Sequence, residues 1–140
     1  MIEIEIEIEP VSKGRPRFTK RGHVYTPAKT RNYEKAIKAE LMAKRPETME
    51  GACHLDITFV RNIPKSWSKK KKQQAIDHEI RPVTPPDLDN YEKAVMDAAN
   101  GVLYKDDSQI VSKHTRKVYG ETPKVIIKIE EIKDRYHGIF

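Results

Sequence analysis

Residues 2–9 alternate strictly between isoleucine and glutamate, and this alternation constrains the fold more than any other stretch of the chain. Successive side chains of a β-strand point to opposite faces, so the pattern predicts a strand with one apolar and one acidic face. The apolar face must pack on a core, whereas the acidic row is typical of a solvated or edge-protecting face. Because an acidic face repels nucleic acid, a polyanion-binding surface is expected elsewhere.

The rest of the chain is strongly basic. The 140 residues carry 27 Lys and Arg against 21 Asp and Glu, a formal net charge of +6. Residues 1–10 contain four of the acids and no base, so the remaining residues hold 27 basic against 17 acidic side chains, a balance of +10. A polyanion that binds this part of the chain would therefore meet a net positive charge. A chain of this length most simply forms one domain.

Cysteine content and hydropathy limit the classes of protein. Cys53 is the only cysteine, which excludes an intrachain disulfide framework and a cysteine-based zinc site. A metal ion would therefore be held by oxygen atoms. No apolar run approaches the roughly 20 residues of a membrane span, and the amino terminus does not resemble a signal peptide. We expect a cytoplasmic protein with no membrane partner.

The order of elements predicts an α+β fold, a single domain over residues 1–140 whose mixed β-sheet is flanked by helices. In chain order we expect a strand, a short hairpin near residues 18–25, a helix, a strand, two helices and two strands. The first helix is predicted to have Thr26 as N-cap and Pro27 as its first residue. Its buried stripe would be formed by Tyr33, Ala36, Ile37 and Leu41.

Two basic segments are candidate DNA contacts. The segment KGRPRF offers Lys13, Arg15 and Arg17 beside glycine and proline, where guanidinium and backbone groups can meet phosphates. A solvated loop is the alternative interpretation. Further along, a short helix capped by Ser66 or Ser68 begins with a run of four lysines near Trp67: Lys69, Lys70, Lys71 and Lys72. Such a run is more often a solvated face, with a nucleic-acid contact as the alternative.

Acidic residues gather around the helix predicted from about Asn90 to Asn100. Asp87 and Asp89 precede it after two prolines, which hold the backbone extended and would project both carboxylates to one side. One aspartate is explained by helix capping, worth about 1 kcal/mol. Lys93 lies four residues from Asp89 and from Asp97, so a surface ion pair would also account for the lysine.

A second acidic pair, Asp106 and Asp107, follows this helix and can return to Asp87 and Asp89 along a strand running back beside it. Converging carboxylates repel one another unless a hard cation such as Mg²⁺ or Mn²⁺ lies between them. Metal ions activate water and stabilise both oxygens of a phosphodiester displacement, with a lysine offsetting charge on the phosphate. The spacing therefore indicates a metal-dependent nuclease, with capping and surface pairing as the competing interpretation.

The segment DLDNYEKAVMDAANGVLYKDDSQI resembles the signature of the RusA family of Holliday junction resolvases. It joins an Asp-Leu-Asp-Asn opening, a lysine four residues after the second aspartate, an Asp-Ala pair, and an Asp-Asp pair ahead of an apolar strand. The resemblance is sharpest from Pro86 to Val118, and the order of elements is compatible over nearly the whole chain.

The resemblance implies a homodimeric endonuclease that needs Mg²⁺ or a similar ion and cuts four-way DNA junctions by symmetric paired nicks, leaving 5′-phosphates. The metal-binding acids of the family would correspond to Asp87, Asp89 and Asp107, and its active-site lysine to Lys93. Asp106 would be a metal ligand or a neighbour of one. Such enzymes act in DNA recombination and repair in bacteria and phages.

Two other functions are compatible with the sequence. A non-catalytic DNA-binding protein of the same fold would use the basic surface to hold phosphates, and its acids would only cap a helix. An RNA-directed nuclease would present the same residues, because the sequence contains no signal for a 2′-hydroxyl. The segment from Ser66 to Thr84 does not align with the family, so DNA contact there is predicted from charge alone.

Overall fold

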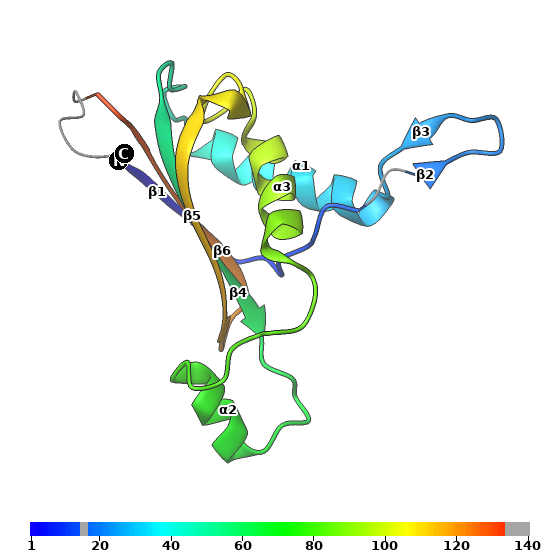
Figure 1. The fold of residues 1–140 in the computed structure, drawn as a ribbon, viewed down its shortest axis with the longest axis vertical. Coiled ribbons are helices and arrows are strands. Elements are labelled where there is room, and N and C mark those ends of the chain that lie inside the picture. The colour runs from blue at the N-terminus through cyan, green and yellow to red at the C-terminus, as the bar shows by residue number, and fades with distance from the viewer. Residues whose placement is uncertain (15–16, 134–140) are drawn as a thin grey trace.

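The computed structural model describes residues 1–14 and 17–133, and its elements follow in the predicted order (Figure 1). The helices and strands are β1 (Ile2–Ile6), β2 (Arg17–Phe18), β3 (Val24–Tyr25), α1 (Ala28–Ala43), β4 (Cys53–Asn62), α2 (Lys69–Ile76), α3 (Leu88–Ala99), the 3₁₀ turn η1 (Asp107–Gln109), β5 (Ile110–Gly120) and β6 (Lys124–Glu131).

Four strands form one mixed sheet in the order β1-β6-β4-β5. The central strand β6 runs antiparallel to β1 and β4, whereas β4 and β5 are parallel. A parallel pair needs a crossover, and α2 and α3 supply it between β4 and β5. The predicted α+β class with a mixed sheet and flanking helices is therefore confirmed.

Helices α1 and α3 cover the same face of the sheet and enclose the core (Figure 1). The inward residues of β4 and β6 are buried there: Leu55, Ile57, Phe59, Val125, Ile127 and Ile129. Two details of α1 were wrong. The helix begins at Ala28 with Pro27 as its N-cap, because Pro27 has extended backbone angles, and Ala36 is exposed, because the helix turns it away from Ile37 and the sheet.

Strand β1 confirms the prediction from alternation. Ile4 and Ile6 are buried, while the glutamates on the other face are exposed. Because β1 pairs only with β6 in the described sheet, its acidic row lies along an edge strand. Glu5 accepts a 2.6 Å hydrogen bond from Lys124 Nζ of β6, which offsets part of that charge.

Strand β5 positions the functional site, because the face that it turns toward α3 is polar. Lys113, Thr115 and Lys117 lie in register with the core residues of β4 and therefore share their face of the sheet. Lys117 Nζ donates to the backbone oxygens of Thr84 (3.0 Å) and Pro86 (2.9 Å). These bonds fix the segment that leads into α3.

Two elements extend away from the sheet and its covering helices (Figure 1). The β2–β3 hairpin, predicted from its turn residues, projects beyond the beginning of α1. At another end of the molecule, α2 begins after Ser68, whose Oγ accepts a hydrogen bond from Lys71 N at 3.2 Å, so Ser68 is the cap. Within the described residues, no helix is long and apolar enough to cross a membrane.

Candidate active site

The acidic residues at the start of α3 are placed differently from the prediction. Helix α3 begins at Leu88, two residues early, so Asp89 lies within its first turn and only Asp87 precedes the helix. Asp87 is the N-cap by backbone angles, yet within the described residues its carboxylate makes no capping hydrogen bond. Both aspartates are exposed. Side-chain capping therefore does not account for Asp87.

Three of the four predicted catalytic residues line one cavity of about 330 Å³ between α3 and the start of β5. Asp89 and Lys93 come from α3, and Asp107 comes from η1. The described lining residues are Asp89, Asn90, Glu92, Lys93, Met96, Asp107 and Lys113. Asp87 and Asp106 are not among them. The predicted return of the chain beside the helix is correct, although Asp107 lies in η1 and the strand begins at Ile110.

Lys93 is paired with Asp97 one helical turn later, with Nζ 3.2 Å from Oδ1. The lysine side chain is 56% exposed, so this i,i+4 pair contributes only about 0.3–0.5 kcal/mol to stability. Of the two partners that the spacing allowed, the structure selects Asp97. Because this ion pair is weak and exposed, the Lys93 ammonium group can leave Asp97 and bind a phosphate instead.

Asp106 has a local structural role. Its carboxylate accepts a 3.0 Å hydrogen bond from Ser108 N, and Gln109 completes a capping box around η1. The hydrogen bonds from Ser108 lower the pKa of the Asp106 carboxyl. Asp106 thus stabilises the turn that carries Asp107.

Glu92 is a site residue that the sequence analysis missed. It is only 8% exposed, and its carboxylate accepts hydrogen bonds from Lys113 Nζ (2.7 Å) and Thr115 Oγ1 (2.6 Å) of β5. A buried carboxylate requires such partners. The sequence does contain a clue to Glu92. It lies beside Tyr91 on the buried face of α3, where the other residues are apolar and an acidic residue is unexpected.

The predicted DNA-binding residue Lys13 is held close to the site by two carboxylates. Its Nζ lies 2.6 Å from Glu34 Oε1 and 3.1 Å from Asp97 Oδ2, and its backbone nitrogen donates to Asn90 O at 2.8 Å. Burial disfavours the charged lysine, but hydrogen bonds to Glu34 and Asp97 outweigh burial and raise the pKa of Lys13. Lys13 and Lys93 thus share Asp97.

The other predicted DNA contacts are not among the described residues that line the cavity. Arg17 belongs to β2, and Arg15 lies outside the described residues. The lysine run forms the first half of α2, where Lys71 Nζ lies 4.1 Å from the centroid of a Trp67 ring. Trp67, which precedes the lysines in the sequence, therefore forms a cation–π contact with one of them within the protein.

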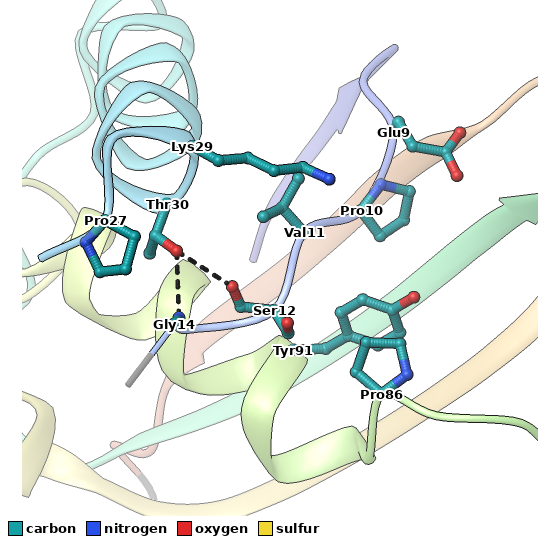
Figure 2. Close-up of a pocket in the computed structure, with 10 residues that line it drawn as sticks. All are labelled: Glu9, Pro10, Val11, Ser12, Gly14, Pro27, Lys29, Thr30, Pro86 and Tyr91. Carbon is teal, nitrogen blue, oxygen red and sulfur yellow. Dashed lines mark hydrogen bonds between the residues drawn. The ribbon is translucent and has the colours of Figure 1, made fainter. Parts of the chain in front are cut away.

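A larger cavity, of about 660 Å³, lies between the segment after β1 and the beginnings of α1 and α3 (Figure 2). Thr30 Oγ1 of α1 accepts a hydrogen bond from Gly14 N (3.0 Å) and donates to Ser12 O (3.3 Å). A Cβ on Gly14 would lie 2.9 Å from Thr30 Oγ1, so glycine permits this approach. These contacts attach the segment before the hairpin to α1.

The oxygen donors of the smaller cavity suit a hard divalent cation. Asp89 and Asp107 line it, and Mg²⁺ commonly takes one or two carboxylates together with water and substrate phosphate oxygens. In residues 1–14 and 17–133, no group of three or more His, Cys, Asp or Glu side chains forms a ready-made metal site. The arrangement therefore fits a metal that the substrate helps to hold.

Comparison with known proteins agrees with the resemblance of the motif. The uncharacterized protein YqaN of Bacillus subtilis (strain 168) is 41% identical over 137 residues, which cover 94% of this chain and 96% of YqaN. The family model described as Endodeoxyribonuclease RusA matches residues 7–130, which include the whole described site. This chain belongs to the RusA endodeoxyribonuclease family.

Proposed function

We propose that this protein is a Mg²⁺-dependent endonuclease that resolves four-way DNA junctions by paired, symmetric nicks. The observation that carries the proposal is the cavity that Asp89, Lys93 and Asp107 line together. RusA-family nucleases act on branched DNA and are generally dependent on divalent metals. The choice of Mg²⁺, with Mn²⁺ as a substitute, follows from the oxygen donors.

Each residue has a distinct role in this proposal. Asp89 and Asp107 would hold the metal, and Asp87 at the N-cap would join them from the neighbouring surface when DNA is bound. The metal would supply an activated water and stabilise the developing oxyanions. Lys93 would leave Asp97 and bind a non-bridging oxygen of the scissile phosphate, where its charge opposes the charge that builds up during cleavage.

Paired nicking implies two equivalent sites. A four-way junction has approximate two-fold symmetry, and an isologous homodimer would place one site on each of two related strands. The products would carry 5′-phosphate and 3′-hydroxyl ends, which a ligase can join. Such a role in recombination and repair of bacterial or phage DNA would place the protein in the cytoplasm.

The decisive experiment incubates the purified protein with an end-labelled four-way DNA junction, a linear duplex of the same sequence, and an RNA junction, each with and without Mg²⁺. We expect paired nicks only in the DNA junction and only with the metal. Asp89→Asn should abolish them. Glu47→Gln, which also removes one negative charge but at an exposed loop residue outside the cavity, should leave them unchanged.

Other outcomes would favour other functions. Tight junction binding with no cutting in any divalent ion would favour a non-catalytic DNA-binding protein. Cutting of the RNA junction in preference to DNA would favour an RNA-directed nuclease. Metal-dependent nicking that survives Asp89→Asn would show that the cavity is not the active site.

A further inference from the structure

The hairpin β2–β3 lies in the most one-sidedly charged part of the sequence. Between Pro10 and Tyr33 the chain has seven basic residues, Lys13, Arg15, Arg17, Lys20, Arg21, Lys29 and Arg31, and no Asp or Glu. A segment with this composition attracts phosphates, although Lys13 is already paired with Glu34 and Asp97. Charge alone, however, does not explain the apolar residues that the hairpin also carries.

The hairpin is an ordered projection with a defined turn (Figure 1). Thr19 N donates to His23 O at 2.8 Å, Gly22 N donates to Thr19 O at 2.9 Å, and His23 N donates to Thr19 Oγ1 at 3.1 Å. Gly22 has a φ of 81°, a conformation that glycine adopts without strain. The turn thus fixes how the two short strands present their side chains.

Apolar side chains are exposed on this projection. Phe18 and Val24 are directly paired across the two strands and are 71% and 60% exposed, and the neighbouring Tyr25 is 43% exposed. Phosphate binding requires none of these groups. An apolar wedge surrounded by cations is the combination with which proteins enter base steps or stack on unpaired bases.

The base of the hairpin is attached beside the candidate active site. Lys13 contacts Asp97 and the backbone of Asn90, both on α3, and Gly14 is bound to Thr30 of α1 (Figure 2). Asp97 is also the partner of Lys93. The segment that leads into the hairpin is therefore attached to the helix that carries Asp89 and Lys93.

We propose that the β2–β3 hairpin is a DNA-binding arm whose Phe18–Val24 pair contacts unstacked bases at the branch point of a four-way junction. This inference rests on the proposed function for its substrate. Branch points are where base stacking is interrupted, so an apolar wedge gains most there, while the surrounding cations bind the converging phosphates. The competing possibility is that the hairpin binds a second copy of the chain, through the acidic face of its β1.

The test uses a DNA junction that carries the fluorescent base analogue 2-aminopurine at the branch point, or within one arm as a reference. Binding is measured without Mg²⁺ and at fixed salt, so that no cutting occurs. We expect the full-length protein to brighten the branch-point probe only. Phe18→Ser and, separately, Val24→Ser should remove the brightening and weaken junction binding about tenfold, with little effect on duplex binding.

Met42→Ser is the matched control, because Met42 is 57% exposed on α1 outside the hairpin and the cavity. Unchanged brightening and affinity in both hairpin variants would overturn the proposal, as would an unresponsive probe with the unmodified protein. A change from dimer to monomer in Phe18→Ser on size-exclusion chromatography would assign the pair to a second copy instead. Brightening that depends on Phe18 in a protein that never cuts would support the arm and refute the nuclease function.

Discussion

Glu92 of α3 and Lys113 of β5 form a 2.7 Å ion pair inside the cavity that also contains Asp89 and Asp107. Thr115 donates a second, 2.6 Å hydrogen bond to the same carboxylate. The pair therefore joins the helix that carries Asp89 and Lys93 to the strand that follows Asp107. It also holds a second lysine ammonium group within the cavity.

Replacing Glu92 should reduce the stability of the fold. We expect Glu92→Ala to reduce the free energy of unfolding by about 1–3 kcal/mol, because it leaves Thr115 and Lys113 without their buried acceptor. The measurement is urea denaturation followed by circular dichroism. Thr115→Val, which loses only one hydrogen bond, should cost about 1 kcal/mol. Equal midpoints for Glu92→Ala and the parent protein would contradict this role.

Tyr104 should make the fold sensitive to alkaline pH. Burial, with a smaller contribution from the charge of Asp107, raises the pKa of Tyr104 above its ordinary value of 10.0. A raised folded-state pKa means that the stabilisation is complete below pH 10 and is lost as the pH rises toward the folded-state pKa. Tyr104→Phe should therefore show a smaller loss of stability above pH 10 than the parent protein.

At neutral pH the same variant should be about 1 kcal/mol less stable, because Tyr104 Oη donates a 2.9 Å hydrogen bond to Met96 O. Urea denaturation at a series of pH values, with exposed Tyr25→Phe as the control, measures both effects. The two variants should diverge above pH 10; parallel stability curves would show that Tyr104 does not titrate with unfolding.

Local sequence patterns predicted most of the architecture. The site was harder to predict, because its ion pairs join residues that are far apart in the sequence. The alternation in β1 identified its buried face, and the apolar stripe of α1 identified the buried Tyr33, Ile37 and Leu41, because each face is set by the period of one element. The predicted starts of α1 and α3 differ from the observed starts by one and two residues. The reason is that Pro27 and Asp87 have extended backbone angles, which residue type alone does not determine. The pairs Glu92–Lys113 and Lys13–Asp97 join segments far apart in the chain, so no local pattern could identify them.

Neutralising the cavity acids should separate DNA binding from cutting. Asp89→Asn and Asp107→Asn should each abolish nicking of the junction and preserve or tighten its binding, because each removes a negative charge facing the phosphate. Competition binding in the absence of metal, beside the nicking assay, measures the two effects independently. If either variant lost binding while retaining its melting temperature, that acid would serve DNA positioning rather than metal chemistry.

The lysine run of α2 can be tested by the salt dependence of binding. Each phosphate neutralised on duplex DNA contributes about −0.9 to the slope of log K against log salt concentration. If Lys69 and Lys70 contact DNA, replacing both with glutamine should make the slope shallower by almost 2 units. Lys35→Gln/Lys38→Gln on the exposed side of α1 removes the same charge and is the control. Equal slopes for the two double variants would identify the run as a solvated face, whereas a shallower slope for the α2 variant alone would extend the DNA-binding surface to α2.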